Sequence, residues 1–301
     1  MNHIEALNSR FAIANQVSFE KDPGGLIIIR IRNPLATACI ALQGGHLMTW
    51  RPKDAEQVVW LSPDAKLAPG KSIRGGVPIC WPWFGPHASE AGFPAHGFAR
   101  TTDWDVVSTK ALTDGATQLT LELDPANMPQ QQWPHATTVQ CLITVGTALK
   151  MELVTRNQGT AEISIGEALH TYFNVSDVRN IDVDGLDGCA YIDKVSGSNN
   201  EQQAGPIKFA SEVDRVYINT QADCLIRDPG LGRQIRISKS GSESTVIWNP
   251  WIEKANKMGD LGEDGYLRMV CVESANAVDN VVIIPAGGEH RLSVSYSVEA
   301  L

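Results

Sequence analysis

Residues 71 to 104 constrain the fold of this chain more than any other stretch; they read KSIRGGVPICWPWFGPHASEAGFPAHGFARTTDW. Five glycines alternate with four prolines here, so the backbone must turn often and cannot form a regular helix. The stretch also holds isoleucines, tryptophans and phenylalanines. Each of these left in solvent would forgo roughly 1.5 to 3 kcal/mol of burial free energy. We therefore expect an irregular segment, called the wall below, that packs against a scaffold and bounds a cavity.

Two arginines and two histidines of the wall are the candidates for chemistry: Arg74, His87, His96 and Arg100. If residues 95 to 100 run extended, His96, Phe98 and Arg100 share one face and point together into the cavity. Spacing alone leaves two interpretations open. These groups are either a functional cation and imidazole, or an arginine paired with a carboxylate and a histidine hydrogen-bonded in a core turn.

Length and charge limit the class of protein. The 301 residues contain no low-complexity or Ser/Gly-rich linker, so we expect one domain over residues 1–301, with residues 1–20 as a lead-in segment. A net charge of −9 without a basic stripe argues against nucleic acid as a partner. Apolar runs are far shorter than the ~20 residues that span a bilayer, and the first residues lack a secretory signal. We predict a cytoplasmic protein with no membrane partner.

The sequence offers no recognisable metal or cofactor motif. Its six cysteines are scattered without a C-x-x-C pair, so we interpret most of them as buried, reduced thiols. Residues 260–265 resemble the start of a calcium loop, but the twelfth position of that loop is Cys271 instead of glutamate. Phosphate-loop, H-E-x-x-H and G-x-S-x-G patterns are missing as well. We expect no cofactor and no metal.

Short β-rich runs bounded by Gly, Pro, Asn and Asp recur along the chain. This pattern favours an all-β fold, a large antiparallel β-sandwich, over a parallel α/β sheet, which needs amphipathic helices between its strands. Residues 157–160 look like a hairpin turn between strands at 150–156 and 163–173, and a helical turn is expected near 252–258. The other predicted strands are 26–31, 36–42, 57–61, 119–123, 138–145, 180–183, 190–195, 215–219, 224–227, 234–238, 244–248, 267–273, 280–284 and 291–298.

Two strand residues are candidates for chemistry. His170 lies in a predicted strand whose apolar face, with Leu169 and Phe173, belongs to the core, which puts the imidazole on the cavity side. Glu273 ends an apolar strand and faces away from Val272. From the residues alone, His170 is either a histidine that hydrogen-bonds a neighbour or a functional group. Glu273 is either a carboxylate at the rim or a functional base.

The wall motifs IRGGVPICWPWFG and HGFAR resemble those of the hexose-6-phosphate mutarotases, also called glucose-6-phosphate 1-epimerases, a branch of the aldose 1-epimerase superfamily. The resemblance continues in family order through ALHTYFNV at 168–175, DRVY at 214–217, IWNPW at 247–251 and VCVES at 270–274. It implies a β-sandwich of the galactose-mutarotase-like type, with a carbohydrate site on a concave sheet face.

The resemblance also implies a catalytic pair, because His170 corresponds to the catalytic histidine of the family and Glu273 to its general base. Interconversion of sugar anomers needs a proton donated to the ring oxygen and a proton removed from the anomeric hydroxyl. One acid and one base therefore suffice. An imidazole with a reference pKa near ~6.5 can give or take a proton at neutral pH, and partial desolvation raises a glutamate from ~4.3 towards that range.

Four further residues are candidates for substrate binding. Arg74 and Arg100 match cationic family positions near the substrate phosphate, and arginine suits a phosphate because its planar fork donates paired hydrogen bonds. Asp214 matches a carboxylate that holds sugar hydroxyls, although an ordinary surface pair with the arginine after it is the alternative. His96 lies on the same wall. The chain departs from the family at Ala95, where some members have glutamine.

The resemblance therefore implies a metal-free isomerase that acts on a small-molecule sugar phosphate, D-glucose 6-phosphate and related aldohexose 6-phosphates. Two rival functions stay open. One is a mutarotase for free aldoses, which has no need for both Arg74 and Arg100. The other is a non-catalytic sugar-phosphate-binding protein, which has no need for an acid and a base together.

For the oligomeric state of the protein, we favour a monomer.

Overall fold

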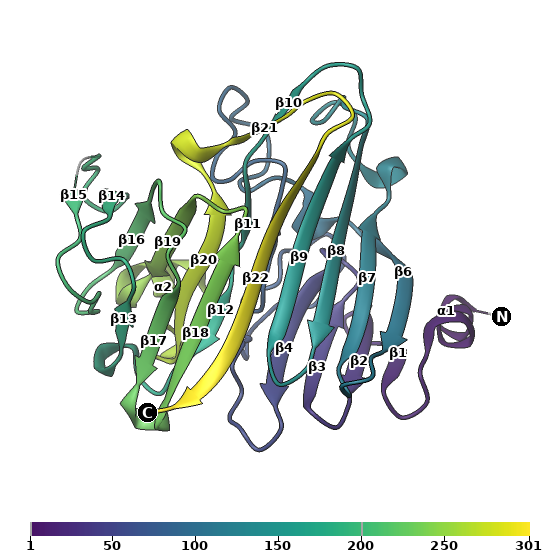
Figure 1. Ribbon diagram of the computed structural model, residues 1–301, viewed down its shortest axis with the longest axis horizontal. Helices are drawn as coiled ribbons and strands as arrows, with labels where there is room; N and C mark the ends of the chain where they lie inside the picture. The colour runs from purple at the N-terminus through teal and green to yellow at the C-terminus, as the bar shows by residue number, and fades with distance from the viewer. Residues whose placement is uncertain (1, 200) are drawn as a thin grey trace.

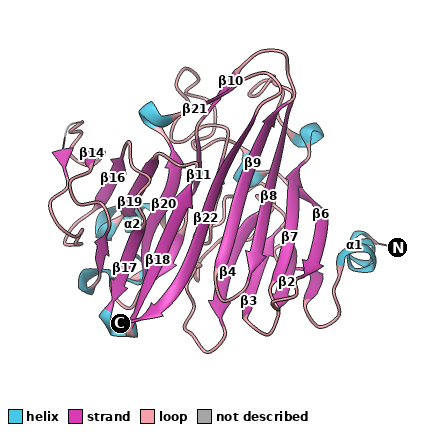
Figure 2. Cartoon of the chain, viewed as in Figure 1, coloured by secondary structure: helices cyan, strands magenta, loops and turns pink. Residues whose placement is uncertain are grey.

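A computed structural model describes residues 2–199 and 201–301 and confirms the all-β prediction, since strands dominate and the helices are short (Figure 2). None of the helices in these ranges is both long and apolar enough to cross a membrane. Strands pair antiparallel along the large sheets. Two layers of sheet face each other to form a sandwich (Figure 1).

An eight-stranded sheet forms one layer. Buried and part-exposed residues alternate along its strands, most regularly over residues 137–145, so one face packs inward and the other meets solvent. In order across the sheet, its strands are β13 (Asp182–Asp184), β17 (Cys224–Asp228), β18 (Arg233–Ser240), β22 (Glu289–Ala300), β9 (Leu149–Asn157), β8 (Thr137–Val145), β7 (Thr117–Leu123) and β6 (Trp104–Ala111).

The opposite layer contains two sheets. The smaller has four strands in sequence order, β1 (Val17–Lys21), β2 (Ile27–Arg32), β3 (Ala36–Ala41) and β4 (His46–Pro52). The larger has the order β15 (Glu201–Gln202), β14 (Ala190–Asp193), β16 (Val213–Tyr217), β19 (Ser244–Asn249), β20 (Met269–Asn276), β11 (Glu167–Leu169) and β5 (Ile79–Cys80), and β12 (Tyr172–Asn174) also pairs with β20. A separate ribbon pairs β10 (Ile163–Ile165) with β21 (Val282–Ile284).

The main hydrophobic core lies between the layers. Ile143 of β8 contributes from one side, and Ile29 of β2 and Val272 of β20 contribute from the other; each is at most 1% exposed. Burial of a side chain of this size stabilises the fold by roughly 1.5 to 3 kcal/mol. Trp81 and Phe98 of the wall belong to the same cluster. The irregular wall is therefore anchored in the core, as the sequence predicts.

Helices occur outside the sheets. α1 (His3–Phe11) begins with a capping box between Asn2 and Glu5, and α2 (Trp251–Met258) ends at Gly259 in the left-handed conformation. The helix expected near 252–258 is thus present. Short 3₁₀ helices are η1 (Ala99–Thr101), η2 (Pro125–Asn127), η3 (Val178–Asn180), η4 (Pro229–Leu231), η5 (Gly265–Arg268) and η6 (Val278–Asn280).

The strand prediction holds for most of the long runs but misses β1, β4 and β6. These three strands carry charged or histidine side chains at several positions, so they lack the apolar run on which the prediction relied. Residues 57–61 were wrongly predicted as a strand. They form only isolated bridges, with Val59 opposite Phe173 and Leu61 opposite Gly75.

The single strand expected over residues 163–173 is broken into β10, β11 and β12. The N–H of Gly166 donates to the carbonyl of Pro82, and the N–H of His170 donates to the carbonyl of Pro78. The segment therefore bonds to the wall at each break. The hairpin expected at 157–160 is also wrong, because β9 pairs with β8 and β22 whereas β10 pairs with β21.

Candidate active site

A cavity of about 680 Å³ lies where the wall meets the face of the sheet formed by β16, β19 and β20. Its lining is mixed, with aromatic and aliphatic side chains such as Phe84, Trp248 and Met258 beside charged groups. All six residues that the sequence proposes for the site line it: Arg74, His96, Arg100, His170, Asp214 and Glu273. Chain segments up to two hundred residues apart in sequence thus converge on one concave surface.

The wall does not present its side chains as a strand does, which corrects the prediction for residues 95–100. His96 has φ +65° and Gly97 has φ +70°, and η1 follows directly. A Cβ on Gly97 would lie 1.9 Å from the carbonyl oxygen of Trp81, so this position requires glycine. Because the chain coils here, Phe98 turns into the core against Trp81, while His96 and Arg100 line the cavity.

His87, also on the wall, lies outside this cavity. Its Nδ1 accepts hydrogen bonds from the N–H groups of Ser89 and Glu90, and its ring packs on Trp83 and Phe93. The structural interpretation therefore fits His87.

His96 is held as a neutral hydrogen-bond donor. Its Nδ1 accepts from the N–H of Gly85 at 3.3 Å, which leaves the ring proton on Nε2. Burial, followed by the charges of Arg100 and Arg74, lowers the pKa of His96 to about 4. At neutral pH this imidazole is uncharged, and its Nε2–H has no hydrogen-bond partner among the described residues, so it can donate to a substrate oxygen.

His170 lies between β11 and β12, on the cavity side of the sheet. Leu169 and Phe173 pack into the main core, as predicted, while the imidazole stacks on the ring of Tyr172 with centroids 5.0 Å apart and planes 11° apart. Trp248 contacts the same imidazole edge-on at 6.0 Å. Packing on two sides fixes the orientation of the ring.

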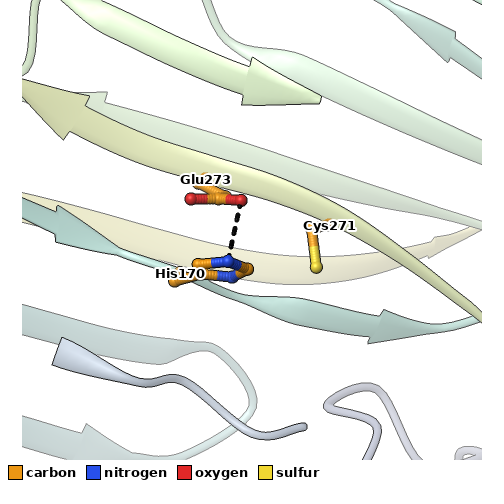
Figure 3. Close-up of side chains that lie close together, drawn as sticks. All are labelled: His170, Cys271 and Glu273. Carbon is orange, nitrogen blue, oxygen red and sulfur yellow. Dashed lines mark ion pairs between the residues drawn. The ribbon is translucent and has the colours of Figure 1, made fainter. Parts of the chain in front are cut away.

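Glu273 lies on β20, where Val272 turns into the main core and the carboxylate turns to the cavity, as the alternation predicts. Its Oε1 lies 3.2 Å from Nε2 of His170 (Figure 3). Burial raises the pKa of Glu273 well above its ordinary value; Asp214 adds to this shift and Arg100 opposes it. Burial, followed by His96, Arg100 and Arg74, holds the pKa of His170 well below its usual range.

These shifts favour the uncharged form of the pair, neutral imidazole and protonated carboxyl. Imidazolium with carboxylate contains the same number of protons, so the two forms interconvert by moving one proton. Glu273 Oε2 and His170 Nδ1 are buried without a hydrogen-bond partner in the described part of the chain. The arrangement is therefore one acid and one base with spare capacity for a polar ligand.

His170, Cys271 and Glu273 together offer nitrogen, sulfur and oxygen donors that lie within 4.8 Å of one another (Figure 3). A cysteine binds a metal as the thiolate, however, and burial raises the pKa of the Cys271 thiol well above its ordinary value. The thiol is fully buried among apolar side chains. This donor set fits a metal centre poorly, and Cys271 fits the buried-thiol interpretation.

Arg74 is partly committed to the protein. Its Nε donates to Asp260 Oδ1 at 3.0 Å, and its Nη1 donates to Tyr172 Oη at 2.9 Å. A guanidinium has five N–H groups, so three remain for other partners. The sequence left open whether this arginine has a structural or a functional role. The geometry combines both, since Arg74 is paired and also lines the cavity.

Arg100 makes fewer hydrogen bonds to the rest of the protein than Arg74 does. Its Nη2 donates to the carbonyl of Ala95 at 2.8 Å, and within the described ranges it makes no ion pair. The contact is with the backbone of Ala95 and does not depend on the side chain at that position. Most of the guanidinium is left for a ligand.

Asp214, on β16, does not form the surface pair with Arg215 that sequence reasoning left open; Arg215 pairs with Asp193 instead. Burial raises the pKa of Asp214, and the opposing charge is Lys254 of α2, whose Nζ lies 3.4 Å from Asp214 Oδ2. Lys194 also lines the cavity. Sequence reasoning missed both lysines. The IWNPW motif, which leads directly into α2, was the available signal for Lys254.

Comparisons with known proteins identify the family of this chain. The chain matches the aldose 1-epimerase family over residues 28–297. It is 40% identical over 253 residues, 84% of each chain, to an Escherichia coli K12 protein named "Putative glucose-6-phosphate 1-epimerase". A crystal structure of a "putative mutarotase" from Salmonella typhimurium superimposes with a TM-score of 0.87 at 34% identity and full coverage of both chains.

A galactose mutarotase-like protein from Lactobacillus casei has the same fold, with a TM-score of 0.69 at 17% identity over 90% of this chain and all of that one. The galactose-mutarotase-like sandwich expected from the sequence is thus confirmed. The chain belongs to the aldose 1-epimerase family.

Proposed function

We propose that this protein interconverts the α and β anomers of D-glucose 6-phosphate and related aldohexose 6-phosphates. The observation that carries the proposal is the contact of 3.2 Å between His170 and Glu273 in a cavity that also holds Arg74 and Arg100. An acid and a base supply the chemistry, and two guanidinium groups supply recognition of a phosphate ester. Relatives named as glucose-6-phosphate 1-epimerases support the same substrate class.

In the reactive form, His170 is an imidazolium and Glu273 a carboxylate. The carboxylate takes the proton of the anomeric hydroxyl while the imidazolium gives a proton to the ring oxygen. The bond between C1 and the ring oxygen breaks, and C1 becomes an aldehyde. Rotation about the C1–C2 bond turns the other face of the aldehyde towards the ring oxygen, and the reverse transfers close the ring as the other anomer. The open-chain step leaves the pair uncharged, which is the form that burial favours.

Substrate binding divides between two parts of the cavity. Arg100, with the remaining donors of Arg74, serves the phosphate, because a phosphate monoester carries about −1.5 to −2 charge at neutral pH. The chain as a whole has a net charge of −9, so attraction must come from these local groups. His96 donates to a sugar oxygen through Nε2–H, and Asp214 accepts from a sugar hydroxyl.

Exchange NMR on glucose 6-phosphate, with and without the protein, tests the proposal. We expect faster exchange between anomers than the spontaneous rate, with a chelator present. Binding without acceleration would favour the non-catalytic sugar-phosphate-binding function. A higher kcat/KM for free glucose than for glucose 6-phosphate would favour the free-sugar mutarotase. We propose that the protein acts in the cytoplasm, where the charge of a sugar phosphate would retain it.

A further inference from the structure

A continuous set of contacts joins the phosphate end of the cavity to the catalytic pair. Asp260 holds Nε of Arg74, Nη1 of Arg74 donates to the hydroxyl of Tyr172, and the ring of Tyr172 stacks on the imidazole of His170. Tyr172 is itself clamped between Trp60, stacked at 6.0 Å, and Trp248, edge-on at 5.9 Å. A rigid tyrosine therefore links the arginine to the histidine.

The same arginine opposes the charge that His170 needs for catalysis. Reaction requires the imidazolium, but Arg74 and Arg100 are both among the charges that lower the pKa of His170, after burial and His96. A bound phosphate of about −1.5 to −2 charge would cancel much of this repulsion. Arg100 also lowers the pKa of Glu273, so cancelling the charge of Arg100 raises the pKa of both members of the pair. Arg74 contacts the hydroxyl of Tyr172, whose ring stacks on the imidazole of His170.

We propose, on the basis of the proposed function, that the phosphate of the substrate activates the His170–Glu273 pair through Arg74 and Tyr172 besides anchoring the sugar. Tyr172 is then a positioning residue for His170. Arg74 is both a ligand of the phosphate and the charge whose neutralisation makes the imidazolium accessible. This activation selects an aldohexose with a dianionic ester remote from C1. Only in such a substrate does the binding energy of a distant group stabilise the reactive form of the catalytic pair.

The test supplies the sugar and the phosphate as two separate molecules. Anomer exchange of free glucose is measured with the full-length protein, with and without inorganic phosphate, at constant ionic strength kept with NaCl. The rate that phosphate alone produces without protein is subtracted. We expect saturating phosphate to raise kcat/KM for glucose by about tenfold or more, although it adds no covalent contact to the sugar.

Two variants test the route. Arg74→Met and Tyr172→Phe should each lose most of this activation, and Tyr172→Phe keeps the ring that stacks on His170. The matched control is Tyr296→Phe, which also removes a buried hydroxyl, one bonded to Thr171 at 2.6 Å on the core side. This control should keep the activation. With glucose 6-phosphate, Tyr172→Phe should lower kcat as well as raise KM, because a purely anchoring role would change KM alone.

The outcomes separate the two proposals. Failure of the wild type to accelerate glucose 6-phosphate exchange would refute the proposed function itself. Normal turnover of glucose 6-phosphate without any effect of phosphate on glucose would overturn only the activation. Activation that survives in both Arg74→Met and Tyr172→Phe would also overturn it.

Discussion

Glu273 Oε1 lies 3.2 Å from His170 Nε2, although 102 residues separate them in the sequence and only Glu273 lies on a strand. β20 carries the carboxylate, while the imidazole follows β11 at the point where the chain bonds to the wall. The contact makes the pair a single proton-transfer unit. Neither group can change its protonation without affecting the other.

Replacement of either member should therefore abolish the cycle. His170→Ala and Glu273→Gln should each lower kcat for glucose 6-phosphate by about two or more orders of magnitude, the usual scale for a general acid or base. The double variant should be little worse than the worse single variant, because the two act as one unit. Exchange NMR gives the rates, and circular dichroism checks folding. Near-normal kcat in either single variant would remove that residue from the mechanism.

Arg100 offers the clearest test of phosphate specificity, because its loss leaves only the Ala95 carbonyl unpaired. A charge-assisted hydrogen bond contributes roughly 1.5 to 3 kcal/mol, so Arg100→Met should lower kcat/KM for glucose 6-phosphate by about ten- to a hundredfold. Free glucose should lose much less. An equal fall for both substrates would assign Arg100 a structural role.

Arg74→Met should behave differently from Arg100→Met, since it also leaves Asp260 without its ionic partner. We expect the same loss of phosphate preference together with a lower thermal stability. Arg74→Met with Asp260→Asn should recover stability but not the preference for the phosphorylated sugar. Thermal unfolding followed by circular dichroism, beside the kinetics, distinguishes the two effects. Recovery of both properties in the double variant would argue against a phosphate contact for Arg74.

Much of the scaffold could be predicted because strand alternation is a local property. In β8, every second residue is buried, and the sequence shows this directly. The break at His170 could not be predicted in this way. It arises because Pro78, more than ninety residues earlier, offers a carbonyl to its N–H. A strand pattern contains no information on such a distant partner.

The residues of the site were found from motifs, but their partners were not. Arg74 and Asp260 are 186 residues apart, and the sequence around Asp260 resembles only the start of a calcium loop. Alternation along an extended segment predicts the side on which His96 lies, but the φ of His96 is +65° and the neighbouring Gly97 packs against the carbonyl of Trp81. Contacts of this kind are set by tertiary packing.

Gly97 should be intolerant of any side chain. A Cβ at this position would lie 1.9 Å from the carbonyl oxygen of Trp81, and the φ of +70° adds strain. We expect Gly97→Ala to lower the melting temperature by several degrees and to reduce activity, since a shifted wall displaces His96 and Arg100. Gly92→Ala is the control, because a Cβ there meets nothing within 4 Å and its φ is not positive. Equal melting temperatures for the two variants would contradict this role.

The contact of 2.9 Å between His290 and the fully buried Glu167 should make stability depend on pH. Burial alone lowers the pKa of His290, but its hydrogen bond and ionic contact with Glu167 outweigh this and raise the pKa above the ordinary value. The folded state therefore binds the proton more tightly than the unfolded state. Its stabilising contribution is fully present below the unfolded pKa, near ~6.5, and is lost as pH rises through the folded pKa.

The matching experiment compares wild type with His290→Gln, which keeps a hydrogen-bond donor but cannot become charged. A free-energy difference of 1 kcal/mol shifts a melting temperature by roughly 2 to 4 °C in a protein of 150–250 residues, and by less in this chain of 301 residues. We expect the wild type to melt about 1 to 3 °C above the variant at pH 5.5, and the gap to narrow by pH 8.5. A gap that widens with rising pH would have the wrong sign and would show that His290 is bound in its neutral form.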